Sequence, residues 1–270
     1  MTNILCIGDI VGEPGLAFLE AHLPALIEQH HADLVLANAE NLHLEAHPNG
    51  SCGMTQAELE RLFALGVQLV TGGNHSWDGP EGSTVHTDPR VLRPLNGGTD
   101  KAGRGAGIFT SSSGFRLGVV NLAGKSAIAT ASDPIVALEA QLQIWQLGTP
   151  ATAVDAVLVD FHGESVFEKI TVAYAFAGRI AGLVGTHTHA PTSDARVLAH
   201  GTAYISDIGM TGPGGGAQGY EPTSFVESLR SQGEIRLPMQ LASGAVELGA
   251  VKIELLGSRA TQITRINLDA

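Results

Sequence analysis

The stretch Gly72-Gly73-Asn74-His75-Ser76-Trp77-Asp78 follows directly on a short apolar run at residues 67–71. That run is rich in β-branched residues and bounded by glycine, which predicts a core strand of a parallel sheet. Two glycines then allow a tight turn, and an amide, an imidazole and a carboxylate come after it. In open α/β sheets, functional groups collect beyond the carboxyl ends of the strands. The stretch therefore predicts an α/β fold with its chemistry at one edge of a sheet.

Four other strand-like runs end in the same way, in polar side chains that suit hard or borderline metal ions. These runs cover residues 3–7, 34–37, 156–160 and 180–184. The side chains that follow them belong to Asp9, Glu40, Asn41, His162, His187 and His189. Taken singly, each has an ordinary structural explanation, such as an Asx turn or a helix cap at Asp9. Their recurrence at successive strand ends favours a shared functional site.

His187 and His189 stand two positions apart after the last of these runs. Side chains at i and i+2 project to the same side of an extended backbone. We therefore expect both imidazoles to reach one metal centre or two adjacent ones. A dinucleotide site at the first strand end is excluded, because the glycines there do not follow the G-x-G-x-x-G spacing and Asp9 would face a pyrophosphate.

The remaining segments alternate between helical and strand-like patterns. Helices are predicted at residues 15–30, 55–65, 135–147 and 167–177, the second of them opened by a capping box from Thr55 to Glu58. Hairpins are predicted at residues 107–121 and 245–267, and the second hairpin, together with residues 203–207, is expected to close a second sheet. Residues 79–105 show no regular pattern, and connections of this length are often functional.

Several polar residues in the connections allow two interpretations. Arg93 and Arg104 would either contact an anion or form salt bridges. The loop Leu42–Gly53 contains two histidines, His43 and His47, that could reach the mouth of the site but fit solvated positions better. The sequence leaves the role of this loop open. Two further histidines, His86 and His200, match no motif, and we expect them on the surface.

Composition limits the class of protein. With 270 residues, of which 44% are hydrophobic and only 16% charged, the chain suits a single α/β domain over residues 1–270. A net charge of −12 argues against binding of duplex nucleic acid, although metal ions could still attract a small phosphate. Cys6 and Cys52 have no metal or redox spacing, and no membrane span or charged leader is evident, so we expect a soluble cytoplasmic protein. The oligomeric state stays open, with a homo-oligomer possible.

The pooled candidates are too many for one zinc ion, which takes four ligands. They are Asp9, Glu40, Asn41, Asn74, His75, His162, His187 and His189. Such a set suits two octahedral or five-coordinate ions that share a bridging carboxylate. Oxygen and imidazole ligands without thiolate favour Mn or Fe, with Zn possible. Two ions about 3.5–4 Å apart clamp the attacking and leaving oxygens of an in-line phosphoryl displacement and supply a hydroxide. We therefore predict two divalent or trivalent metal ions and a small phosphate ester substrate.

These motifs resemble the calcineurin-like metallophosphoesterases and, more narrowly, their YmdB-type branch. The resemblance extends over nearly the full length. It is carried by Gly8-Asp9-Ile10-Val11-Gly12, Glu40-Asn41, Gly73-Asn74-His75-Ser76-Trp77-Asp78, Asp160-Phe161-His162, Gly185-Thr186-His187-Thr188-His189 and Asp207-Ile208-Gly209-Met210-Thr211-Gly212-Pro213. It implies a four-layer αββα sandwich of two mixed β-sheets flanked by helices, a dinuclear metal centre, and 2′,3′-cyclic nucleotide phosphodiesterase activity.

The resemblance also implies a role for each candidate. Asp9, Asn41 and His189 would hold one ion, and Asn74, His162 and His187 the other, with Glu40 as the bridge. His75 would protonate the leaving oxygen or stabilise the developing charge. The wider superfamily has a histidine two residues after its first aspartate; this chain has Val11 there, and Asn41 is the natural replacement.

Three functions compete for this set of residues. A metal-dependent phosphodiesterase for small cyclic or linear nucleotides is the leading hypothesis. A phosphomonoesterase, or nucleotidase, would use the same metal ions and differ in pocket depth and anion contacts. A metal-binding regulatory protein with low turnover is the third, and the candidate proton donor His75 argues against it, because a scaffold has no use for one.

Overall fold

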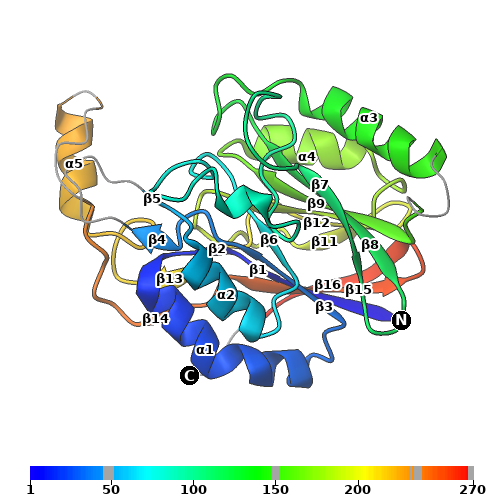
Figure 1. Ribbon diagram of the computed structural model, residues 1–270, viewed down its shortest axis with the longest axis horizontal. Helices are drawn as coiled ribbons and strands as arrows, with labels where there is room; N and C mark the ends of the chain where they lie inside the picture. Colours follow the sequence, from blue (N-terminus) through cyan, green and yellow to red (C-terminus); the bar gives the residue numbers. More distant parts are fainter. Residues whose placement is uncertain (45–51, 148–152, 232, 234–238, 267–270) are drawn as a thin grey trace.

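The computed structural model describes residues 1–44, 52–147, 153–231, 233 and 239–266, and its main elements form four layers (Figure 1). Helices α1 (Gly12–Gln29) and α2 (Gln56–Ala64) cover the outer face of one sheet. Helices α3 (Pro134–Leu147) and α4 (Val166–Ala175) cover the outer face of a second. The predicted αββα sandwich is therefore confirmed. No helix in the described part of the chain is both long and apolar enough to cross a membrane.

The first sheet has the strand order β16-β15-β1-β3-β6. Its strands are β1 (Thr2–Ile7), β3 (Leu34–Asn38), β6 (Leu69–Thr71), β15 (Ala250–Leu256) and β16 (Arg259–Arg265). The strands β1, β3 and β6 run parallel, whereas β15 pairs antiparallel with both β1 and β16. The hairpin predicted at residues 245–267 thus completes the first sheet rather than the second, which corrects that expectation.

The second sheet has the order β11-β12-β10-β9-β8-β7. Its strands are β7 (Ala106–Thr110), β8 (Arg116–Ala123), β9 (Ala156–His162), β10 (Gly182–Thr186), β11 (Arg196–Leu198) and β12 (Thr202–Ile205). The four central strands are parallel, and the antiparallel strands β7 and β11 form the edges. Both sheets are therefore mixed, and their parallel strands set the polar strand ends side by side.

Three apolar layers hold the sandwich together. One lies between the first sheet and its helices, one between the two sheets, and one between the second sheet and its helices. Strands buried on both faces explain the continuous apolar runs in the sequence, as is usual for parallel sheets covered by helices. Helix α2 begins as predicted, because Thr55 and Glu58 form both hydrogen bonds of the capping box.

Smaller elements surround the polar end of the sandwich. Strand β2 (Asp9–Ile10) pairs with β13 (Met210–Pro213), which also pairs with β14 (Val246–Glu247). A Cβ atom on Gly8 would lie 1.8 Å from the Gly209 carbonyl oxygen, so only glycine permits this approach. Asp9 is thus held inside a short strand, not in the Asx turn or helix cap that was its ordinary structural explanation. The other short elements are β4 (His43–Leu44), β5 (Cys52–Gly53), a 3₁₀ turn (Val85–Thr87) and α5 (Pro222–Arg230).

Candidate metal centre

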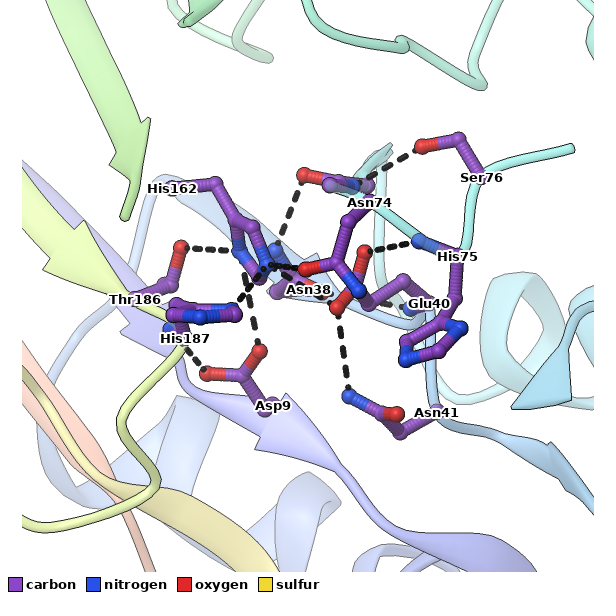
Figure 2. Close-up of polar contacts among 12 residues, drawn as sticks. Asp9, Asn38, Glu40, Asn41, Asn74, His75, Ser76, His162, Thr186 and His187 are labelled. Carbon is purple, nitrogen blue, oxygen red and sulfur yellow. Dashed lines mark hydrogen bonds and ion pairs between the residues drawn. The ribbon is translucent and has the colours of Figure 1, made fainter. Parts of the chain in front are cut away.

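The predicted site residues come together where the parallel strands end (Figure 2). Asn74 follows β6, His162 ends β9, and His187 follows β10. Glu40 and Asn41 follow β3, and Asp9 lies in β2. We call these residues, with His189, the donor cluster.

His162 lies at the centre of this cluster. Its Nε2 atom is 2.9 Å from Glu40 Oε1, 3.0 Å from Asn74 Oδ1 and 3.0 Å from His187 Nδ1. One ring nitrogen can donate only a single hydrogen, so these contacts cannot all be hydrogen bonds. Neighbouring ligands on an octahedral ion with bonds of about 2.1 Å lie about 3.0 Å apart. The donor set therefore fits a metal ion, and Glu40, His162 and His187 offer ligand atoms within 4.8 Å of one another.

The other donors are more widely spaced. Asp9 Oδ1 lies 3.8 Å from both His162 Nδ1 and His189 Nε2, and this buried oxygen has no hydrogen-bond partner among the described residues. Asn41 Nδ2 lies 3.2 Å from His189 Nε2. A half-turn of the Asn41 amide would present its oxygen instead. We call Asn74, His162 and His187 the tight half of the cluster, and Asp9, Asn41 and His189 the open half.

Glu40 joins the two halves. Its Oε1 atom lies 2.9 Å from His162 Nε2 and 3.4 Å from Asn41 Nδ2, while Oε2 accepts from the His75 backbone N–H at 2.9 Å. Gly73 makes this packing possible, because a Cβ atom there would lie 2.2 Å from His162 Nε2 and 2.4 Å from Glu40 Oε2. Any side chain at position 73 would displace two donors.

The charges in the cluster favour a cation. Burial opposes ionisation of Glu40, yet the neighbouring His162 lowers the pKa of this carboxyl to about 2. Burial likewise opposes a charged imidazole, but Glu40 and Asp9 raise the pKa of His162 to about 9. Burial raises the pKa of Asp9. The carboxylates of the cluster thus stabilise a positive charge on the imidazole. Metal binding displaces protons from such ligands, so the same carboxylates would stabilise a metal cation in place of that proton.

His187 and His189 do not lie on an extended backbone, which corrects one expectation. Their φ angles are 104° and 62°, in the region that L-residues rarely adopt. Asp207 holds this turn, because its Oδ2 atom accepts from the Thr188 backbone N–H at 3.1 Å and from the buried Lys169 ammonium at 3.1 Å. The turn directs His187 to the tight half and His189 to the open half. Nothing in the sequence alone pointed to Lys169.

His75 lies beside the cluster and is held by a carboxylate. Its Nδ1 atom is 2.9 Å from Asp78 Oδ2, which leaves Nε2 available. Burial lowers the pKa of His75, but Asp78 and Glu40 outweigh this effect and raise it overall. A histidine poised in this way can hold a proton near neutral pH.

A pocket of about 260 Å³ opens beside both halves of the cluster and His75. Asn74 and His187 of the tight half and Asn41 and His189 of the open half line it. Its polar wall includes donor-cluster residues and His75; the opposite wall consists of Cys52, Gln218, Tyr220, Phe225 and Met239. The hydroxyl of Tyr220 contacts Cys52 Sγ at 3.4 Å. No pattern in the sequence pointed to this wall, apart from the Gly-rich segment at residues 212–219 that precedes Tyr220.

The remaining candidates lie away from the donor cluster. His43 is half-buried and contacts Glu58 at 3.1 Å, while His47 is outside the described residues. His86 is buried, not on the surface, because its Nε2 atom bonds to the Ser76 carbonyl at 2.7 Å; His200 is exposed as expected. Arg93 is buried and donates to the Pro94 and Leu95 carbonyls, and Arg104 is exposed.

Comparisons with known proteins extend over nearly the whole chain. Residues 5–266 match the family model described as YmdB-like protein. A Bacillus subtilis (strain 168) protein named 2′,3′-cyclic-nucleotide 2′-phosphodiesterase is 32% identical over 267 residues, which cover 98% of this chain and 96% of the relative.

Two solved structures are also similar, each with a TM-score of 0.85. A hypothetical protein from Thermus thermophilus is 32% identical and covers 97% of both chains. A phosphatase from Mycoplasma pneumoniae is 29% identical and covers 99% of this chain and 93% of its own.

Proposed function

The chain belongs to the YmdB-like family, as its motifs indicate, and on this premise we propose a metal-dependent phosphodiesterase that hydrolyses small nucleotides. Relatives named phosphodiesterase and phosphatase identify it as a hydrolytic phosphoesterase. The name of the Bacillus subtilis relative supports 2′,3′-cyclic nucleotides as substrates. The observation that carries the proposal is the convergence of three donors on His162 Nε2 beside a pocket.

Two metal ions per chain are proposed. Asn74, His162 and His187 would hold one, Asp9, Asn41 and His189 the other. The position of Glu40 Oε1 between the halves supports its role as the bridge. Nitrogen and oxygen donors without thiolate favour Fe or Mn, with Zn possible. When bound, such ions activate a water molecule at neutral pH and neutralise charge on the phosphate.

The protein's own groups would supply orientation and a proton. In hydrolysis, the attacking water gives up one proton to solvent and its oxygen forms a bond to phosphorus in line with the leaving oxygen, while the bond from phosphorus to that leaving oxygen breaks. We assign His75 Nε2 as the donor of the proton that the leaving oxygen takes up, or as the group that stabilises its developing charge. Asp78 holds the ring through Nδ1 and supports the protonated form.

The pocket suits a substrate with an organic portion. Its volume of about 260 Å³ is near the lower end for ligand sites. Its apolar wall, formed by Tyr220, Phe225 and Met239, gives a nucleoside group a surface that inorganic phosphate would not need. We take residues 1–270 as one domain, because β1 and β15 share a sheet. Cys6 and Cys52 are buried thiols, which suit a reducing compartment such as the cytoplasm.

The test combines metal content with turnover. Protein reconstituted with Mn²⁺ or Fe²⁺ is assayed on a 2′,3′-cyclic nucleotide, a linear phosphodiester and a phosphomonoester. About two ions per chain with preference for the diesters is the expected result. Preference for the monoester would assign a phosphomonoesterase instead. Metal without turnover would favour a regulatory protein, and no metal after reconstitution would contradict the proposal.

A further inference from the structure

His162 contacts a second polar group behind the donor cluster. Strands β9 and β10 are parallel neighbours, and their register sets Thr186 beside His162 and Val184 beside Asp160. The Thr186 hydroxyl lies 2.9 Å from His162 Nδ1, a contact drawn in Figure 2. The same hydroxyl lies 2.7 Å from Asp160 Oδ1. The three side chains form a chain of contacts from the core to the donor cluster.

The direction of these hydrogen bonds follows from the donors available. Asp160 Oδ2 accepts from the Thr71 hydroxyl and from Asn38 Nδ2, and Oδ1 accepts from the Thr186 hydroxyl. Since the single hydrogen of Thr186 is directed to Asp160, its oxygen can only accept from His162. His162 then carries a hydrogen on Nδ1, and Nε2 is the nitrogen that would offer its lone pair to a metal ion in the tight half.

We propose that Asp160 and Thr186 are positioning residues that hold His162 in the Nδ1–H tautomer and thereby set the metal affinity of the tight half. The inference rests on the proposed role of His162 as a metal ligand. Groups that bind the far nitrogen of a ligating histidine generally fix its ring and raise its basicity. Here a neutral hydroxyl transmits the effect of a carboxylate to the imidazole.

Burial makes this contact hard to replace. Asp160, His162 and Thr186 have exposed fractions of 4%, 0% and 1%, so water cannot easily take the place of a lost hydroxyl. His189 differs, because its Nδ1 atom bonds to the backbone carbonyl of Gln218 at 2.9 Å. His187 Nε2 has the Glu164 carboxylate 3.7 Å away, beyond hydrogen-bond distance. Among these three histidines, His162 is therefore the one whose far nitrogen bonds to a side chain, and this contact can be tested by substitution.

Thr186→Val removes the hydroxyl and keeps the shape of the side chain. We expect the more tightly held Mn²⁺ to bind about 10- to 100-fold more weakly in a chelator competition with the purified protein. Thr186→Ser restores the hydroxyl and should return the affinity to within a few-fold of the wild type. Thr71→Val is the matched control, because Thr71 bonds to the same carboxylate without touching His162.

Equal losses in Thr186→Val and Thr71→Val would overturn the proposal, as would an unchanged affinity in Thr186→Val. Nitrogen-15 NMR of the Zn²⁺-loaded wild type gives an independent readout should a variant fail to fold. We expect a slowly exchanging hydrogen on His162 Nδ1, and its absence would also overturn the proposal. If the wild type binds metal and hydrolyses diesters, and the metal affinity of Thr186→Val is unchanged, only this inference is contradicted. Wild type that binds no metal would remove the proposed function with it.

Discussion

The two halves of the donor cluster differ in spacing and in support. In the tight half, His162 Nε2 lies 3.0 Å from Asn74 Oδ1 and from His187 Nδ1. In the open half, Asp9 Oδ1 lies 3.8 Å from His189 Nε2. His162 ends a buried strand, whereas His189 sits at a positive φ angle and lines the pocket. The tight half, which is built around a strand residue, is therefore the half whose donor atoms already have the spacing of ligands on one metal ion.

This difference in spacing indicates that the two halves bind their metal ions with different affinities. A preorganised donor set loses less free energy on ordering when it binds its ion. We therefore expect the tight half to hold its ion more strongly and the open half to exchange its ion more readily.

The largest effect is expected from His162→Ala, which removes the Nε2 atom that both Asn74 and His187 contact in the tight half. Loss of metal charge stabilisation worth several kcal/mol corresponds to a fall in turnover of about 10³-fold or more. Metal content, measured by mass spectrometry, should fall with it. His86→Ala removes another buried imidazole outside the cluster and should leave metal content unchanged. Full metal content in His162→Ala would contradict the assignment.

His75→Ala separates chemistry from metal binding in both halves. Turnover should fall by roughly 10²-fold or more while metal content stays the same, because His75 is assigned to proton transfer. His43→Ala is the matched control, since His43 also pairs with a carboxylate but outside the pocket. An unchanged rate in His75→Ala would remove His75 from the mechanism.

Chelation tests the comparison directly. If the halves differ in affinity as their spacing suggests, the protein should lose its metal in two stages as the chelator concentration rises. The chelator concentrations at the two midpoints should differ about tenfold or more. His189→Ala should abolish the first stage and retain about one ion per chain in a site proposed for two. A single stage of loss in the wild type would show that the halves bind with equal strength.

The smallest effect is expected from Tyr220→Phe. Losing the contact with Cys52 should lower the free energy of unfolding by about 1 kcal/mol, as measured by urea denaturation. Metal content should not change, because Tyr220 touches no donor in the described contacts. A loss of metal from the open half would show that the pocket wall supports His189.

The sequence predicted an α/β fold and the set of polar strand ends because both follow from local pattern, whereas the four-layer sandwich was implied by the family resemblance. Runs such as residues 156–159 are apolar throughout, as strands covered on both faces must be, and the residues after them have nowhere to lie except at the sheet edge. The capping box at Thr55 is equally local. The site residues remain a prediction, although the fold brings all of them to one place.

What the sequence did not predict depends on distant partners. The hairpin at β15 and β16 has the same pattern whichever sheet it joins, and only its pairing with β1 decides this. The sequence around His86 does not predict burial, yet the side chain is buried and bonds to the Ser76 carbonyl. Asp160 and Thr186 look like ordinary strand residues until the register of β9 and β10 sets Thr186 beside His162, where its hydroxyl also reaches Asp160.

The position of β1 also bears on biogenesis. Ile4 in β1 pairs with Ile253 in β15, so a nascent chain leaving the ribosome keeps one edge of β1 unpaired until β15 has emerged. An unpaired strand edge invites misassembly, and a chaperone that shields it would protect the chain during this interval. Because Asp9 follows β1 within two residues, metal loading should come after synthesis of β15. Chains arrested on the ribosome before β15 should accordingly be digested by protease and bind no metal, and protection of such chains would contradict this order.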